Sequence, residues 1–277
     1  MVTGMRGDRA RSALTGTRFA DVRWVSETGS TNRDALELAA AGAPEGVVVV
    51  ADNQHAGRGR LDRSWHAPPG GSLLMSILFR PELSVADAHL LTTAVGVSAA
   101  QACRAIADVE PSLKWPNDLV IDSDGRGVVR KLGGILAESV VEGGALRAVV
   151  VGIGLNVNWP PDLPPELNDI ATALNHLTGG EVDREDLLIA LLGALDGWYT
   201  AIVDRSGDGP ARLMDQARNR SATLGRQVRV DLGGTQVEGE AVALTDEGAL
   251  VVAVTTPTGV DRRVIVAGDV IHLRPTD

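Results

Sequence analysis

Hydrophobic positions repeat with a period of two in some segments and of 3.6 residues in others, and the two patterns interleave to about residue 218. Such interleaving is typical of α/β or α+β proteins rather than of helical bundles or β-sandwiches. Aliphatic runs bounded by glycine, proline or charge predict strands at Gly46–Ala51, Ser72–Phe79 and Arg147–Ile153.

Three helices are predicted where a hydroxyl or acidic residue is followed, three positions later, by an aspartate, as in a capping box. The last of these helices carries an apolar stripe that we expect to face the core rather than a partner protein. The helix-start pairs are Thr31 with Asp34, Ser84 with Asp87, and Asp183 with Asp186, and the stripe comprises Leu187, Leu191, Leu195, Tyr199 and Ile202.

Two segments are predicted to be connections. The sequence DSDGRGVV, between Ile121 and Arg130, is typical of a hairpin tip, because Asp-Gly supplies the positive φ that a tight turn needs. That hairpin would fold the motifs on either side of it toward each other. The stretch Asn158–Pro165 holds four prolines, too many for a helix or a central strand, and indicates a surface connection.

From about Ser221 the pattern changes to short strands separated by turns rich in glycine, aspartate and threonine. This pattern fits a small β-barrel of about 55 residues. We therefore expect a flexible segment over residues 1–20, a large domain over residues 21–220 and a small barrel over residues 221–277. The strands of the barrel are expected near Gln227–Asp231, Gln236–Ala243, Ala249–Thr255, Arg262–Val266 and Val270–Leu273.

Composition limits the classes of protein that the chain can belong to. A formal net charge of −10 argues against a general nucleic-acid coat, which needs clustered Lys and Arg to neutralise phosphates. No apolar run occurs before Phe19, so neither a signal peptide nor a membrane span is predicted there, and we expect a cytoplasmic protein. Cys103 is the only cysteine, which excludes an internal disulfide and a cysteine-based zinc site and predicts a buried structural role.

Lysine is almost absent from the chain. Of 26 basic residues only Lys114 and Lys131 are lysine, and the other 24 are arginine. A preference for arginine codons explains the 24 arginines. It does not explain why both exceptions lie 17 positions apart, each in a dense run of glycine, tryptophan, proline, asparagine and aspartate. Because a planar guanidinium cannot replace a compact ammonium that must reach one oxygen, both lysines are candidate functional residues.

A basic, glycine-containing loop follows a predicted strand, with the sequence QHAGRGRLDRSW over Gln54–Trp65. Its glycines let the backbone approach a ligand, and its arginines are forked donors for phosphate or carboxylate oxygens. The alternative is a solvated, flexible basic loop. The loop is neither a Walker motif nor a dinucleotide fingerprint, because it lacks the spacing of either.

Four further clusters carry candidate chemistry. Lys114–Leu119 (KWPNDL) places a lysine and Asp118, which could orient it or help hold a metal, in a rigid turn, although such a turn is often only structural. Lys131–Leu136 (KLGGIL) begins with a lysine, and its paired glycines would let a flat ligand lie against the strand. Gly152–Asn158 ends a buried strand with an amide. Gly29–Asn32 lies at a helix start, where unpaired N–H groups favour an anion or a carbonyl, the alternative being an ordinary N-cap.

Taken in order, the strings STN, QxAGRGR with a following RxW, KWPNDL, KLGGIL and GxGxN resemble the signature of biotin protein ligases, and the resemblance covers nearly the whole chain after Phe19. It implies an α+β fold with a mixed-sheet, class II synthetase-like catalytic domain and a C-terminal SH3-like β-barrel. It also implies contacts to biotin from Ser30, Thr31, Asn32, Gln54, Arg58, Gly59, Arg60, Lys131, Gly133 and Gly134. Contacts to ATP or the adenylate are implied for Arg58, Arg60, Arg63, Trp65, Lys114, Asn117, Lys131 and Asn156.

The resemblance implies that biotin and MgATP form biotinyl-5′-AMP, and that biotin then passes to a lysine of a biotin carboxyl carrier domain of acyl-CoA carboxylases. Lys114, Lys131 and Arg63 are the expected catalytic residues, acting electrostatically, and no protein-bound metal site is predicted. The chain departs from the usual GRGRxGR at Asp62, which stands where the family has glycine. The scattered histidines are expected to be surface or packing residues.

Two other functions remain open at this stage. A lipoate or octanoate transferase would also use a pocket lysine, but the KWPNDL and GRGR strings argue against it. A biotin-sensing repressor would need a DNA-reading module of about 60 residues, and only about 20 to 25 residues precede the large domain that is expected from residue 21. We therefore expect a monofunctional ligase that binds neither DNA nor membranes, as a monomer or a homodimer.

Overall fold

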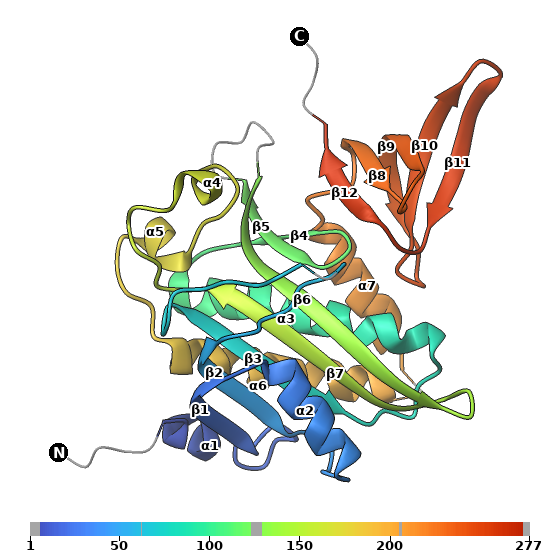
Figure 1. The fold of residues 1–277 in the computed structure, drawn as a ribbon. Helices are drawn as coiled ribbons and strands as arrows, with labels where there is room; N and C mark the ends of the chain where they lie inside the picture. The colour runs from blue at the N-terminus through green and yellow to red at the C-terminus, as the bar shows by residue number, and fades with distance from the viewer. Residues whose placement is uncertain (1–5, 62, 123–128, 205–206, 274–277) are drawn as a thin grey trace.

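The computed structural model describes residues 6–61, 63–122, 129–204 and 207–273. These residues form a seven-stranded mixed sheet with helices on both faces, and a separate five-stranded antiparallel sheet at the C-terminal end (Figure 1). This arrangement confirms the predicted α+β class. The predicted hairpin tip falls on residues 123–128, which lie outside the described residues, and the strands on its two sides pair antiparallel as predicted.

The large sheet has the order β1-β2-β3-β7-β6-β5-β4, in which only β1 and β2 are parallel to each other. Every residue of β3 is buried, because this strand lies between two neighbours and is covered on both faces. The strands are β1 (Val22–Thr28), β2 (Val48–Gln54), β3 (Ser72–Phe79), β4 (Ser112–Lys114), β5 (Asp118–Asp122), β6 (Val129–Glu142) and β7 (Ala145–Asn156).

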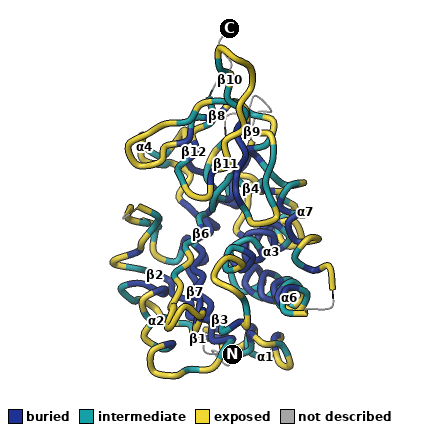
Figure 2. Tube along the Cα trace, turned by 90° about the vertical axis from the view of Figure 1, so that its right-hand side faces the viewer, coloured by how far each residue is buried: buried dark blue, intermediate teal, exposed yellow. Residues whose placement is uncertain are grey.

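Two long helices, α3 (His89–Ala107) and α6 (Arg184–Val203), cover one face of this sheet, and α2 (Thr31–Ala40) packs on the other (Figure 1). All five members of the predicted stripe on α6 are buried. Both long helices could cross a membrane by length and composition, but their buried sides form the main core, as in core helices of other proteins. Buried residues accordingly gather along the central strands and these two helices (Figure 2). The remaining helices are α1 (Asp8–Ala13), the 3-10 turn η1 (Ala86–Ala88), α4 (Pro165–Asn168), α5 (Leu174–Thr178) and α7 (Gly209–Asn219).

The alternation of side chains along β7 separates the two faces. Val149, Val151 and Ile153 point into the core beneath α3 and α6, whereas Val150 packs toward α2. Because side chains alternate along a strand, Gly152 and Gly154 lie on the α2 face. Cys103 is fully buried within α3, as predicted, and burial raises the pKa of its thiol to about 12.

The predicted helix starts are confirmed only in part. The Asp183 carboxylate accepts hydrogen bonds from the N–H groups of Glu185 and Asp186 at 2.8 and 3.0 Å, and α6 begins directly after it. In α2, however, the N-cap residue is Ser30, and its side chain makes no capping hydrogen bond. The pair Ser84 and Asp87 closes only the turn η1, and α3 begins at His89.

The N-terminal segment differs from the expectation of a flexible segment. Its helix α1 buries Ala10, and Leu14 and Phe19 behind it are buried in the main core. The ring of Phe19 meets that of Phe79 edge to face at 5.8 Å. Residues 8–20 are therefore a packed part of the large domain, because apolar side chains among the arginines reach the core.

The small C-terminal sheet has the order β11-β10-β9-β8-β12, and all its pairs are antiparallel. The strands agree closely with the predicted ones, while closure into an SH3-like barrel stays a prediction. Trp115 of the large domain packs against the core of this sheet, and its Nε1 donates to the Gly248 carbonyl at 3.0 Å. The strands are β8 (Gln227–Asp231), β9 (Gln236–Leu244), β10 (Leu250–Thr256), β11 (Gly259–Ile265) and β12 (Asp269–His272).

Candidate active site

The candidate site lies on the α2 face of the large sheet, over a floor of glycines. Gly134 of β6 pairs with Gly154 of β7, and Leu136 pairs with Gly152. A Cβ on Gly154 would lie 2.6–2.8 Å from the indole of Trp65, and a Cβ on Gly134 would lie 3.2 Å from the same ring. The flat group against these glycines is therefore the Trp65 side chain, and glycine is required because any larger residue would displace it.

A buried polar cluster forms the wall beside this floor, at the start of α2. The side chain of Gln54, at the end of β2, accepts hydrogen bonds from the Thr31 N–H at 2.8 Å and from the Thr31 hydroxyl at 3.1 Å. It thus caps the helix from another strand, which explains why Ser30 does not. Ser76 donates to Thr31 Oγ1 or Asn32 Oδ1, at 2.7 and 2.6 Å. Ser30, Thr31 and Asn32 are each only 4% exposed, as a pre-formed polar site requires.

The glycine-arginine loop, which the structure describes over residues 57–61 and 63–65, folds as a small hairpin over the floor. Arg58 and Ser64 form an isolated β-bridge, and the N–H of Trp65 donates to the Gly57 carbonyl at 2.9 Å. The Arg63 guanidinium forms an ion pair with Asp269 of β12 at 2.5 Å. The Arg60 guanidinium donates to the Asn117 side chain and to the Gly268 carbonyl, both at 3.3 Å. Asp62, the departure from the family pattern, lies outside the described residues.

Asp118 lies between the motifs of the two lysines: its strand position pairs with Lys114, and its carboxylate forms an ion pair with Lys131. Lys131 Nζ lies 2.7 Å from Asp118 Oδ1 and 5.4 Å from the centre of the Trp65 ring. Burial lowers the pKa of Lys114; the charges of Asp118 and Asp269 oppose that shift, and the charge of Lys131 adds to it. Both ammonium groups therefore lie in one electrostatic environment.

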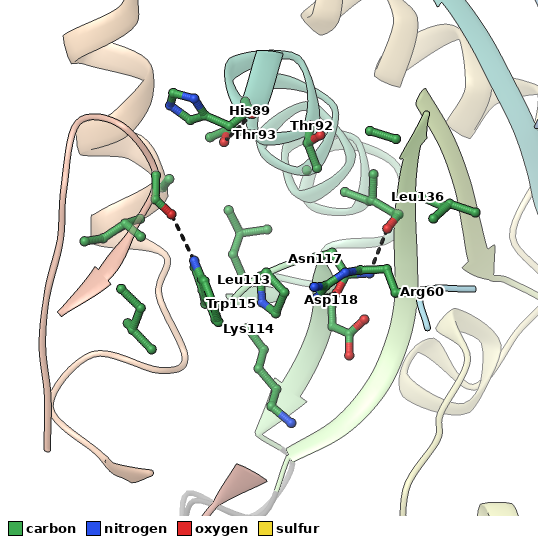
Figure 3. A pocket seen from close by; sticks show the side chains of 18 of the residues that line it. Arg60, His89, Thr92, Thr93, Leu113, Lys114, Trp115, Asn117, Asp118 and Leu136 are labelled. Carbon is green, nitrogen blue, oxygen red and sulfur yellow. Dashed lines mark hydrogen bonds between the residues drawn. The ribbon is translucent and has the colours of Figure 1, made fainter. Parts of the chain in front are cut away.

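Two adjoining cavities belong to this region. The smaller, of about 140 Å³, is lined by most of the residues predicted from the motifs. The larger, of about 520 Å³, lies between α3, the β4–β5 turn and the C-terminal sheet. In Figure 3, Lys114, Asn117, Asp118 and Arg60 lie on one side of it, with Leu113 and Trp115 beside them and Thr92 and Thr93 of α3 opposite. Loop residues 58–61 and the pair Asn117 and Asp118 line both cavities.

Three predicted residues do not line the smaller cavity. Lys114 lines only the larger cavity, and neither Gly133 nor Asn156 lines either one. A Cβ on Gly133 would meet the Gly154 carbonyl and Leu155. The Asn156 Nδ2 donates to the carbonyls of Thr172 and Lys131 at 2.9 and 3.4 Å, so this amide holds the strand that carries Lys131. Its Oδ1 is buried and has no hydrogen-bond partner among the described residues.

Two residues of the site were not predicted from the sequence. Glu138 lies on β6 in the same alternating series as Gly134 and Leu136, a periodicity that could have identified it. Asp269 comes from β12, where no local pattern marks it, and His272 of the same strand lines neither cavity. Burial lowers the pKa of His272 to about 4, and the charge of Lys114 contributes to that shift.

Comparison with known proteins gives matches over both domains. Residues 24–156 match the family model described as "Biotin/lipoate A/B protein ligase family", and residues 223–273 match "Biotin protein ligase C terminal domain". The chain is 36% identical to the bifunctional ligase/repressor BirA of Bacillus subtilis over 80% of its own length and 66% of that protein's. It is 38% identical to the biotin--[acetyl-CoA-carboxylase] ligase of Mycobacterium tuberculosis, over 96% of its own length and 94% of that protein's.

Among solved structures, the chain resembles the biotin protein ligase from Aquifex aeolicus in complex with biotin and ATP. The TM-score is 0.75 and the identity 28%, over 92% of this chain and 100% of the other. The likeness therefore includes the small C-terminal sheet as well as the large one.

Proposed function

Because the chain belongs to the biotin protein ligases, we propose that it joins biotin to ATP as biotinyl-5′-AMP and transfers the biotin to a lysine of a carboxyl carrier domain. The observation that carries this proposal is the glycine floor flanked by the α2 polar cluster on one side and by Lys131, Lys114 and Arg60 on the other. The polar cluster offers hydrogen-bonding groups for a neutral ring with amide groups, and the basic side chains offer positive charge for anions.

Biotin is proposed to bind against the polar cluster at the start of α2. The Gln54 Oε1 is already committed to Thr31, so the Gln54 amide NH2 is the group that can donate to a ureido oxygen. The Ser30 hydroxyl and the hydroxyl of Thr31 complete the set of hydrogen-bonding groups for the ring. This placement directs the carboxylate tail of biotin toward Lys131.

ATP is proposed to bind beside Trp65, with its phosphates near Arg60, Lys114 and Lys131. Two anions repel each other, so the site must supply positive charge where the carboxylate attacks the α-phosphorus and pyrophosphate leaves. Lys131 and Lys114 are proposed to stabilise the developing charge, and Arg63 contributes from the loop. No enzyme nucleophile is involved, and the rest of the rate increase comes from holding the two reactants in line.

Magnesium accompanies ATP in the proposed reaction. Among the described residues no group of three or more His, Cys, Asp or Glu side chains could form a protein metal site. Mg²⁺ in nucleotide sites is usually held by one or two carboxylates together with phosphate oxygens, and Asp118 and Asp269 fit that need. When bound, the ion would neutralise part of the phosphate charge.

In the second step the lysine amine of the carrier domain attacks the carbonyl of the mixed anhydride, and AMP leaves. The glycine-arginine loop covers the adenylate between its formation and the transfer step, and it excludes water. We place this reaction in the cytoplasm, and the carrier domain of an acyl-CoA carboxylase is the proposed partner.

The decisive experiment incubates the protein with biotin, MgATP and a carrier domain and weighs the carrier by mass spectrometry. We expect the mass of one biotinyl group to be added, only when ATP is present. Lys131→Ala should abolish biotin-dependent exchange of pyrophosphate into ATP, and native exchange in this variant would refute the assignment. Competition with lipoate tests the alternative function, because exclusive modification by lipoate would overturn the choice of biotin.

A further inference from the structure

Glu138 joins three parts of the site that are far apart in the sequence. It lies on β6, and its side chain is on the same face as the glycine floor because it follows Gly134 and Leu136 in the alternation. Arg58 Nη2 lies 2.8 Å from both carboxylate oxygens of Glu138. The Asn32 Nδ2 donates to one of the same oxygens at 2.8 Å. The carboxylate thus connects the glycine-arginine loop with the start of α2.

The N–H groups of the Asn32 amide are both used within the protein. Its Nδ2 donates to Glu138 and to the Leu136 carbonyl at 3.2 Å, and the Ser76 hydroxyl, which donates either to Asn32 or to Thr31, lies 2.6 Å from its Oδ1. A Cβ on Gly152 would lie 2.0 Å from that oxygen, so the amide is packed against the strand backbone. Asn32 therefore holds Glu138 in place, and its side chain has no N–H group left to donate to a ligand.

The charge of the Arg58 guanidinium is balanced by the Glu138 carboxylate, which its Nη2 contacts. Arg58 also forms the bridge with Ser64 that closes the base of the loop hairpin. Arg60 and Trp65 extend from this hairpin, so their positions over the glycine floor depend on where its base is fixed.

We propose that Glu138 is a positioning residue that fixes the base of the loop to the start of α2. In this proposal Arg58 holds the loop in place through Glu138 and does not contact substrate anions. The proposal rests on the function proposed above for the pocket. Arg58 and Arg60 both line the two cavities, but among the described residues only Arg58 has a carboxylate partner; the proposal therefore assigns direct anion binding to Arg60 and leaves the contribution proposed for Arg63 unchanged.

The first test compares Glu138→Gln with Glu142→Gln. Glu142 is on the same strand and pairs with Arg147 at 3.4 Å, far from the loop, so it is a matched control for the loss of one carboxylate. Trypsin cleaves after arginine, and cleavage after Arg60 and Arg63, followed by mass spectrometry without substrates, reports how firmly the loop is held. We expect Glu138→Gln to speed this cleavage about fivefold, with an unchanged thermal unfolding midpoint, and Glu142→Gln to change neither. Equal cleavage in the two variants would overturn the proposal.

The second test is a double-mutant cycle on the KM values for biotin and ATP. If Arg58 only holds the loop in place, Arg58→Gln and Glu138→Gln should raise these KM values by similar factors, about fivefold, and the double variant should have KM values no higher than those of either single variant. If Arg58 contacts a substrate anion, Arg58→Gln costs more than Glu138→Gln and the two losses add, which overturns the proposal. The trypsin measurement needs no enzymatic activity, so a failure of the proposed function would be recognised separately, by a wild-type protein that does not exchange pyrophosphate.

Discussion

Replacing Gly154 by alanine should weaken ATP binding through a defined steric conflict. The new Cβ would lie 2.6 Å from Cε2 of Trp65 and 2.8 Å from its Cζ2 and Nε1. Carbon atoms in good contact are about 3.5–4.0 Å apart, so one of the two groups must move by about 1 Å. The strand cannot give way easily, because β7 pairs with β3 on one side and β6 on the other. The indole is therefore the group that moves.

The magnitude follows from the role proposed for Trp65. A displacement of about 1 Å in a group that orients a substrate can cost about 10²-fold in rate, which corresponds to about 2.7 kcal/mol. Trp65 also lies 5.4 Å from Lys131 Nζ, so its movement disturbs the lysine as well. The three atoms nearest the new methyl group all belong to Trp65 and none to the polar cluster at Thr31 and Gln54. We expect kcat/KM for ATP to fall about 10²-fold, with a smaller change in KM for biotin.

The assay is biotin-dependent exchange of labelled pyrophosphate into ATP, with each substrate varied in turn. Gly193→Ala is the matched control, because this exposed glycine within α6 has no atom within 4 Å of its would-be Cβ. It should leave the kinetics unchanged and stabilise the protein by about 1 kcal/mol. Trp65→Ala alone should lose a similar factor, and adding Gly154→Ala to it should cost little more. A Gly154→Ala enzyme with native KM and kcat for ATP would refute the reasoning.

Three further predictions follow from the same region. Because burial lowers the pKa of Lys114, its ammonium should lose its proton as pH rises through that lowered pKa, and kcat/KM for ATP should fall on the alkaline side. Lys114→Arg should move this fall to higher pH, and an alkaline fall at the same pH in both enzymes would show that it does not come from Lys114. The pKa of His272 is lowered to about 4 from 6.5, so the unfolded chain binds more protons than the folded one between these pH values. The free energy of unfolding should therefore decline as pH falls from 6.5 toward 4, by less than about 1.4 kcal/mol per pH unit because the ring is partly exposed. In urea unfolding, His272→Gln should show a flatter decline with pH than the wild type, and an equal decline would contradict this. Trp115→Ala should cost about 2–3 kcal/mol in urea unfolding, since it removes packing against the C-terminal sheet and the bond to Gly248; a loss below 1 kcal/mol would show that this contact does not join the domains.

The sequence predicts strands well where one pattern decides the structure. Ser72–Phe79 is a continuous apolar run and forms β3 with the predicted bounds, because both faces of this strand are covered. The five short strands after Ser221 are equally clear. The α2 start is predicted one residue late, because Gln54, from another strand, caps the helix and no local pattern contains that contact.

Most of the candidate site could likewise be predicted, because its residues occur in compact strings that the chain brings to one sheet face. The contacts that position those strings could not. Glu138 binds Arg58, 80 residues away in the sequence, and Asp269 binds Arg63 across 206 residues. Asp269 is unremarkable in its local sequence, and the alternation that places Glu138 on the site face does not identify its partner. Their partners are fixed by strand register and by the docking of the C-terminal sheet, which only the folded structure establishes.

The distribution of charge in the site indicates what its free cations are for. Lys131, Arg58 and Arg63 each have a carboxylate partner, in Asp118, Glu138 and Asp269 respectively. Within the part of the chain that the structure describes, no carboxylate lies within ion-pairing distance of Arg60 or Lys114, and burial is the main cause that lowers the pKa of each. Holding a desolvated cation without a close partner destabilises the fold, and an anion bound between the two would relieve that cost. ATP, or pyrophosphate alone, should therefore raise the unfolding temperature of the wild type more than that of an Arg60→Gln or Lys114→Gln variant.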